Sequence, residues 1–320
     1  MRVFLAGATG AIGRRLVPQL VAAGHEVTAT TTSPAKVELL RRLGATPVVV
    51  DGLDAAAVGE AVARARPDAI VHQMTGLAGI ADLRRFDRTF AKTNELRTNG
   101  TDHLLAGALS AGARRLIVQG FAGWPTVREG GPVKTEDDPL DPNPPATMRE
   151  TLDAFRYLER VVPRAEGIEG LVLRYGGFYG PPEDMPPRFL EMVRKRRFPI
   201  VGDGGGVWSF IHLADAADAT IAALDHGAPG IYNIVDDDPA PVAEWLPAFA
   251  DAIGAKPPRH VPRWLGRIAG GEAGVSMMTQ VRGASNAKAK RELQWEPRHP
   301  SWREGFRDAL GAARPAGAAA

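Results

Sequence analysis

The chain has 320 residues, and its 39 lysines and arginines nearly balance its 37 aspartates and glutamates, which leaves a formal net charge of +2. This balance excludes the strongly basic surface that is typical of nucleic-acid-binding proteins. The sequence has no cysteine, so disulfides and thiolate metal sites are excluded, and no metal site is predicted. No apolar run approaches the ~20 residues that span a bilayer, so we expect a cytoplasmic protein without a membrane partner.

The first predicted strand, 3–6, leads into a glycine-rich turn and then into an amphipathic helix at 11–23. The turn reads Gly7-Ala8-Thr9-Gly10-Ala11-Ile12-Gly13. Gly7 permits a tight turn, Gly10 lets the backbone approach a pyrophosphate, and Gly13 lets the helix pack on the strand. Free backbone N–H groups and the helix dipole favour a negative charge at this point. The turn therefore predicts a bound dinucleotide cofactor, held by Gly7, Thr9, Gly10, Ala11, Ile12 and Gly13.

The end of the second predicted strand, 27–31, bears on the choice between NAD and NADP. An NAD site usually has an acidic residue here, which binds the ribose 2′-hydroxyl. This segment reads Thr30-Thr31-Thr32-Ser33-Pro34-Ala35-Lys36 and has no carboxylate. Thr32, Ser33, Lys36 and Arg14 could instead receive a 2′-phosphate, so we expect NADP, with NAD as the less favoured cofactor. The alternative is that Lys36 and Arg14 are ordinary bases on helix surfaces.

The alternation of strands and helices continues along the chain. Further strands are predicted at 47–50, 69–72, 116–119 and 171–174, and helices at 34–43, 55–64, over a long stretch that ends near residue 110, and at 147–162. Short apolar strands that alternate with helices of ten or more residues are typical of βαβ units. Crossovers in such units are right-handed, so the pattern predicts an α/β fold with a Rossmann-type, doubly wound parallel sheet.

After residue 175 the elements become shorter, and glycine and proline are concentrated at 176–187 and 202–206. Later elements are predicted at 208–212, from residue 214, and at 231–235, 242–253 and 263–269. We therefore expect a dinucleotide-binding Rossmann domain over residues 1–175. Residues 176–320 are expected to form a smaller α/β substrate-binding lobe, interleaved with the last strands of the main sheet.

Taken together, these motifs resemble the extended short-chain dehydrogenase/reductase family, which includes nucleotide-sugar epimerases and dehydratases. Matching segments lie throughout the chain: Asp51-Gly52-Leu53-Asp54, Val71-His72-Gln73-Met74, Leu173 to Pro181, Gly202-Asp203-Gly204, Phe210 to Asp215, and Lys288 to Pro297. The resemblance implies further cofactor contacts from Asp51, Gly52, Gln73, Met74, Tyr175, Gly177 and Phe178. It also implies a homodimer through the helices at 97–110 and 147–162.

The catalytic signature of that family is missing. The family usually carries Tyr-x-x-x-Lys on the helix after the fifth strand, because a nearby lysine lowers the tyrosine pKa from about 10 and makes the phenol an effective acid–base group. Counting back from Glu159 places the pair at Thr151 and Phe155, whereas counting forward from Pro144 places it at Met148 and Leu152. Neither alignment yields tyrosine or lysine, and the two alignments remain open.

The other expected catalytic positions also differ from the family pattern. The usual Ser or Thr after the fifth strand falls on Gly120 or Phe121, and the usual Asn-x-x-Gly-Thr segment has Arg97 in the place of asparagine. Apolar residues recur at helical spacing over 148–162, which is explained by core packing, by an apolar pocket, or by both. The candidate pocket residues are Phe121, Trp124, Met148, Thr151, Phe155, Tyr179, Trp208 and His212. Tyr179 is the candidate proton donor, although a tyrosine at such a position is more often a packed ring with its hydroxyl satisfied.

Three functions are consistent with these residues. The first is an atypical NADP-dependent oxidoreductase that transfers hydride to an apolar carbonyl, enone or imine compound, with a non-standard proton donor or water. The second is an epimerase or dehydratase that holds its cofactor tightly, which the missing base disfavours. The third is a non-catalytic NADP-binding sensor. For the oxidoreductase, the expected partner is a small, mainly apolar substrate.

Overall fold

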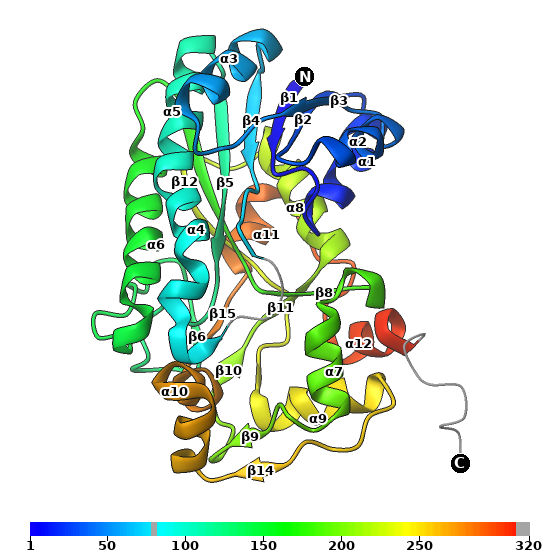
Figure 1. The fold of residues 1–320 in the computed structure, drawn as a ribbon. Coiled ribbons are helices and arrows are strands. Elements are labelled where there is room, and N and C mark those ends of the chain that lie inside the picture. The colour runs from blue at the N-terminus through cyan, green and yellow to red at the C-terminus, as the bar shows by residue number, and fades with distance from the viewer. Residues whose placement is uncertain (78–81, 312–320) are drawn as a thin grey trace.

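The computed structural model describes residues 1–77 and 82–311. Seven parallel strands form the main sheet in the order β12-β7-β5-β4-β1-β2-β3, which confirms the doubly wound α/β fold (Figure 1). The strands are β1 (Arg2–Ala6), β2 (Glu26–Thr31), β3 (Thr46–Val49), β4 (Ala69–His72), β5 (Arg115–Phe121), β7 (Glu169–Tyr175) and β12 (Gly230–Ile234). The central strands are buried along nearly their whole length, as the continuous apolar runs predict.

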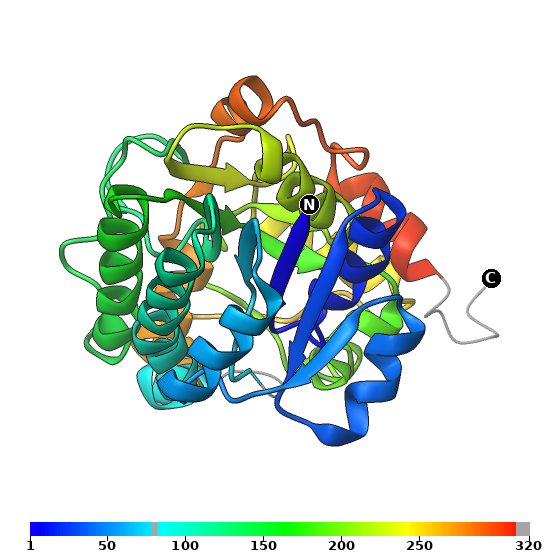
Figure 2. The ribbon, with the colours of Figure 1, turned by 90° about the horizontal axis from the view of Figure 1, so that it is seen from above.

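Helices cover both faces of this sheet (Figures 1 and 2). The core on one face includes side chains from α1 (Gly13–Ala22), α2 (Val37–Arg42), α8 (Leu213–Asp225) and α11 (Ala287–Leu293). The core on the other face includes side chains from α3 (Ala55–Ala65), α5 (Asn99–Ala111) and α6 (Arg149–Val161), and α4 (Phe86–Arg97) packs against α5 and α6. On α1, Leu16, Val17 and Leu20 are buried at the spacing of one helix face.

The long helix expected before residue 110 is two helices. Helix α4 ends at Arg97 and α5 begins at Asn99, because Thr98 has φ −95° and ψ −83°, outside the helical region. The Thr98 hydroxyl donates to the Asn94 carbonyl, which competes with the backbone ladder at this point. The break is important for the site, because it leaves Arg97 at the carboxyl end of α4.

The helix expected at 263–269 is longer. It continues as α10 (Arg263–Thr279) across a kink at Gly271, whose φ of +68° lies in the region that glycine adopts without strain. The two adjacent glycines therefore bend this helix and do not end it.

The C-terminal half of the chain builds a second core and also returns to the main sheet. Short strands β8 (Gly177–Tyr179) and β11 (Phe210–His212) pair in parallel, and α7 (Pro187–Arg194), α9 (Val242–Ala252) and α12 (Trp302–Leu310) pack around them. The largest buried side chains of this core are Trp245, Phe249, Trp302 and Phe306. Within the described residues, no helix has the length and hydropathy needed to cross a bilayer.

Candidate active site

The glycine turn after β1 is packed too closely for side chains at two of its three glycines. Gly7 has φ +87°, and a Cβ there would lie 2.6 Å from the Gln73 carbonyl carbon; a Cβ at Gly13 would lie 2.6 Å from the Gly7 carbonyl oxygen. A Cβ at Gly10 would meet only the Gly7 oxygen, at 3.5 Å. The fold therefore requires Gly7 and Gly13, while Gly10 leaves the backbone open on its outer side.

The backbone that follows this turn offers free hydrogen-bond donors. Helix α1 has no side-chain cap, and in the part of the chain that the structure describes no acceptor bonds the amides of Ala11, Ile12 and Gly13. Unpaired amides at a helix N-terminus attract a pyrophosphate through hydrogen bonds and the helix dipole. This cradle fits the dinucleotide that the sequence predicts.

Of the residues expected near the adenosine part of the cofactor, some form hydrogen bonds within the fold and others are exposed on the surface. The Thr30 hydroxyl accepts from the Gly7 amide at 3.1 Å, and the Thr31 hydroxyl accepts from the Ser33 amide at 3.2 Å. Thr32 and Lys36 are exposed close by, after β2. Arg14 does not join them, because it forms an ion pair of 3.1 Å with Asp184.

Most of the other expected cofactor residues support the edge of the sheet. Gln73 donates to the Tyr175 hydroxyl at 3.1 Å, and both side chains are buried, Tyr175 completely. The Met74 side chain is packed against Gly52, because a Cβ added at Gly52 would lie 2.3 Å from the Met74 sulfur. Asp51 is exposed and accepts from the Leu53 amide at 3.1 Å.

A cavity of about 240 Å³ lies at the carboxyl end of β5, beside β8. Because β1, β4 and β5 are parallel neighbours, the cavity and the glycine turn lie along the same edge of the sheet. Among the described residues, seven aromatic side chains line it: Phe86, Phe90, Phe121, Trp124, Phe155, Phe178 and Trp208. The polar side chains on its wall are Thr75, Arg97, Gln119, Thr151 and Ser209.

The cavity brings together many of the expected pocket residues. Phe121, Trp124, Thr151, Phe155 and Trp208 line it, and so do Gly177 and Phe178, which were expected at the cofactor. Met148 does not line it but is buried behind it, in a cluster with Phe86 and Trp124. The rings of Phe86 and Trp124, and of Trp124 and Phe155, meet edge to face at 5.2 and 5.8 Å, so one side of the cavity is a continuous aromatic wall.

Two pairs at or near the start of α6 were candidates for the family's tyrosine and lysine positions, and one of them lines the cavity. Thr151 and Phe155 line the cavity, whereas Met148 and Leu152 are buried away from it. The geometry favours the alignment counted from Glu159, in which threonine and phenylalanine stand at the positions expected for the family's tyrosine and lysine. The Thr151 hydroxyl donates to Asp87 at 2.7 Å and accepts from the Asn94 amide at 3.0 Å, so it is held as part of the scaffold.

Tyr179 lies outside this cavity. Its ring is buried against Phe306 of α12, and its hydroxyl faces Gly305, where a Cβ would lie 2.2 Å from the oxygen. Burial raises the pKa of this phenol far above its usual range, and among the described residues the Tyr179 hydroxyl has no hydrogen-bond partner. The geometry does not support Tyr179 as a proton donor to a substrate in the aromatic cavity.

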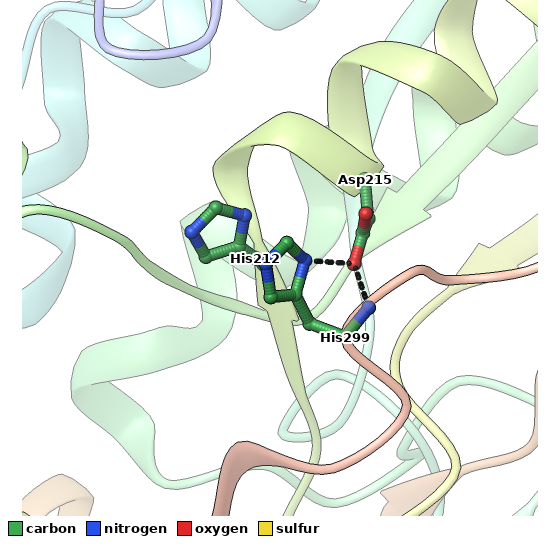
Figure 3. Close-up of side chains that lie close together, drawn as sticks. All are labelled: His212, Asp215 and His299. Atoms are coloured by element: carbon green, nitrogen blue, oxygen red, sulfur yellow. Dashed lines mark hydrogen bonds and ion pairs between the residues drawn. The ribbon is translucent and has the colours of Figure 1, made fainter. Parts of the chain in front are cut away.

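His212 also lies apart from the cavity lining, in a cluster with Asp215 and His299 (Figure 3). Its Nδ1 accepts from the Ala214 amide at 3.2 Å and caps α8, while His299 donates to Asp215 through both its backbone amide and its Nδ1, at 2.8 and 3.0 Å. The two imidazole rings stack with centroids 3.9 Å apart and planes 30° apart. The His212 Nδ1, the His299 Nδ1 and an Asp215 oxygen are already engaged in these hydrogen bonds, so we assign no metal to this cluster.

The sequence missed several residues of the cavity. Phe86 and Phe90 reach it from α4, Met277 from the end of α10 and Val281 from the segment after that helix. No local motif marks these residues. Arg97 also lines it, with its guanidinium carbon 4.0 Å from the centre of the Phe155 ring. The one available signal was the arginine that stands in the place of the family's asparagine.

His72 gives the fold a predictable dependence on pH. Its Nδ1 accepts from the Met74 amide and its Nε2 donates to the Leu96 carbonyl, and burial lowers its pKa to about 4. Below pH 6.5 the unfolded chain binds a proton that the folded protein refuses, so stability falls between pH 6.5 and pH 4, by on the order of 3 kcal/mol. Urea unfolding midpoints across this range are expected to show a smaller fall in His72→Asn, whose amide does not titrate and can still accept from the Met74 amide; an unchanged fall would contradict this assignment.

Comparison with known proteins supports the family resemblance. The model of the NAD dependent epimerase/dehydratase family matches residues 3–235. A Streptomyces protein named 3-diazoavenalumate denitrifying reductase is 42% identical over 96% of this chain and 99% of its own length. The 2-alkyl-3-oxoalkanoate reductase of Stenotrophomonas maltophilia is 27% identical over 80% of this chain and 76% of its own.

Among solved structures, the UDP-glucose 4-epimerase of Thermus thermophilus, in complex with NAD, is 25% identical to this chain. It covers 99% of this chain and 100% of its own, with a TM-score of 0.74. The expectation of an NAD(P)-dependent oxidoreductase is confirmed in this coarse form by the family and by relatives named as reductases. The chain therefore belongs to the NAD dependent epimerase/dehydratase family, of the extended short-chain dehydrogenase/reductase type.

Proposed function

We propose that this protein is a reductase that uses NADP(H) and acts on an aromatic substrate without a proton donor from the protein. The observation that carries the proposal is the wall of the cavity, where Thr151 and Phe155 replace the tyrosine and lysine of the family. Thr151 is committed to Asp87 and Asn94, and the rest of the wall is mainly carbon. Such a site orients a flat aromatic molecule and excludes water, but it supplies no general acid.

A reaction that consumes hydride but no proton suits this site. Reductive removal of dinitrogen from an aromatic diazonium group is such a reaction. When bound, the reduced dinucleotide supplies a hydride, which forms the new C–H bond while the C–N bond breaks and its electron pair leaves with N2. The 42% identity to a denitrifying reductase of a diazo compound, over almost the whole of both chains, supports this reaction class.

The preference for NADP rests on the segment after β2. It has no carboxylate to bind a 2′-hydroxyl, whereas Thr32, Ser33 and the exposed Lys36 lie together there. The pairing of Arg14 with Asp184 removes one of the expected phosphate ligands, so Lys36 is the cation that supports this preference.

A second candidate is the reduction of an apolar carbonyl, enone or imine compound, because relatives include a ketoreductase and a 2-alkyl-3-oxoalkanoate reductase. Here the oxygen or nitrogen must gain a proton from water, because the Thr151 hydroxyl already donates to Asp87 and the Ser209 hydroxyl is engaged with the backbone of Ala284. An epimerase or dehydratase activity is disfavoured, since oxidation of an alcohol needs a base that the wall does not provide.

The test combines cofactor titration with product analysis. Purified protein is expected to bind NADPH more tightly than NADH, and to convert an aromatic diazonium compound to the arene with release of labelled N2. Deuterium from C4-labelled NADPH should enter the ring, with none entering from deuterated solvent. Turnover of ketones but not diazo compounds would replace the first candidate by the second, and tight NADPH binding without turnover of either class would favour a sensor.

A further inference from the structure

Arg97 is a buried cation in an apolar cavity without a counter-ion. The residue is 9% exposed, and its guanidinium lies over the Phe155 ring. Among residues 1–77 and 82–311, no carboxylate lies within ion-pair distance of it. Burial lowers its pKa only to about 9, so it remains charged at neutral pH. An unpaired buried charge is costly, and its retention calls for a ligand that compensates it.

The side chain is held in place by neutral partners. One of its terminal nitrogens, Nη1, donates to the Asn94 side-chain oxygen at 3.1 Å, and the Asn94 amide donates to Thr151 at 3.0 Å. Asp87, the nearest acid in this chain of contacts, is engaged by the Thr151 hydroxyl and by the amides of Glu150 and Thr151 at the start of α6. The carboxylate of Asp87 therefore fixes the scaffold. Among the described residues, Asn94 provides the one hydrogen-bond acceptor for the Arg97 guanidinium, and Arg97 lines the cavity.

The other N–H groups of this guanidinium have the shape that a carboxylate recognises. A guanidinium presents a planar fork of N–H groups that binds the two oxygens of a carboxylate, and water exclusion strengthens such a pair. The neighbouring surface, formed by Trp124 and Phe155, offers aromatic faces for a flat ring. A molecule that places an aromatic ring on this wall and an anionic end at Arg97 would satisfy both parts of the cavity.

We propose that Arg97 is the receptor for a carboxylate of the substrate, so that the substrate class is an aromatic carboxylic acid. This inference rests on the proposed function for the identity of the cavity as the substrate site. Arg97 is then a specificity-determining residue that holds the acid end of the molecule, and the reacting carbon lies at the other end, toward β8 and the glycine turn.

The test measures binding and does not depend on turnover. Isothermal titration calorimetry with 4-hydroxycinnamate, its carboxamide and its methyl ester is carried out on the NADP⁺-loaded full chain. The variants are Arg97→Met, Arg97→Lys and the matched control Arg88→Met, which removes an exposed arginine from the same helix. Arg97→Met removes a buried unpaired charge, so its melting temperature is expected to be equal or higher, which separates binding from folding.

The wild-type protein is expected to prefer the carboxylate over the amide and ester by about 30-fold or more. Arg97→Met should lose about 100-fold in affinity for the carboxylate and little for the amide, as expected for loss of a buried, charge-assisted contact. Arg97→Lys should fall between, and Arg88→Met should match the wild type.

Equal binding of carboxylate and amide by the wild-type protein, or binding of neither, would overturn the proposal. So would a loss of NADP⁺ affinity in Arg97→Met with the carboxylate preference intact, because Arg97 would then serve the cofactor. Carboxylate-selective binding without reduction of any diazo or carbonyl acid leaves the receptor in place and contradicts the proposed function. Reduction of such a substrate without a preference for the carboxylate would support the proposed function and contradict the role of Arg97 as a carboxylate receptor.

Discussion

Replacing Gly7 by alanine is expected to lower the free energy of unfolding by roughly 2–4 kcal/mol. The backbone at Gly7 has φ +87°, which an L-residue adopts only with strain, and the added methyl group would lie 2.6 Å from the backbone of Gln73. The backbone of Gln73 cannot move away easily, because its amide donates to the Ala6 carbonyl at the end of β1. Urea unfolding followed by circular dichroism would measure the loss.

Gly10→Ala provides the matched control for this change. A Cβ at Gly10 meets only the Gly7 carbonyl oxygen at 3.5 Å, so the variant should fold with nearly unchanged stability. The methyl group would nevertheless stand where a pyrophosphate approaches the turn, and NADPH affinity is expected to fall by at least about tenfold. Equal destabilisation by the two substitutions, or full cofactor affinity in Gly10→Ala, would contradict the assignment of the turn.

Replacing Arg174 by methionine is expected to destabilise the protein by about 3–5 kcal/mol. Arg174 on β7 donates to both oxygens of Glu159 on α6, at 2.6 and 2.7 Å, and both side chains are almost fully buried. Loss of the arginine leaves a buried carboxylate without its partner, and the pair fixes the helix that carries Thr151 and Phe155. The free energy of unfolding would be obtained from urea titrations.

A double-mutant cycle separates the pair from the rest of the core. Glu159→Met should be as damaging as Arg174→Met, whereas the double variant should recover much of the loss, because no buried charge remains. The control is Arg64→Met, which breaks the exposed pair with Glu60 on α3 and should change stability by less than about 0.5 kcal/mol. Additive losses in the double variant would show that the two residues act independently.

The sequence predicted the sheet well because the signals that specify it are local. Most of these strands are short apolar runs between turn residues, and all seven strands of the main sheet lie where the sequence predicts them. The break between α4 and α5 was missed because a threonine at position 98 does not by itself predict the end of a helix. The Thr98 side chain donates a hydrogen bond to the Asn94 carbonyl, and this local contact competes with the helical backbone bonds.

The site was harder to predict because it depends on which way side chains face. In the short strand β8, Phe178 lines the cavity, and since successive strand residues point to opposite sides, Tyr179 points into the second core. Phe86 and Met277 converge from helices almost 200 positions apart, and that contact is set by packing and not by any local pattern.

The contact between Arg97 and Phe155 also constrains how this protein could have diverged from its relatives. A lone change of Phe155 to lysine, toward the family pattern, would set an ammonium group against the guanidinium that now lies 4.0 Å from the ring centre. Two like charges in a buried cavity repel strongly, so the intermediate would be disfavoured until Arg97 also changed. A variant that restores the family's tyrosine and lysine at positions 151 and 155 is therefore expected to need a neutral residue at position 97 as well.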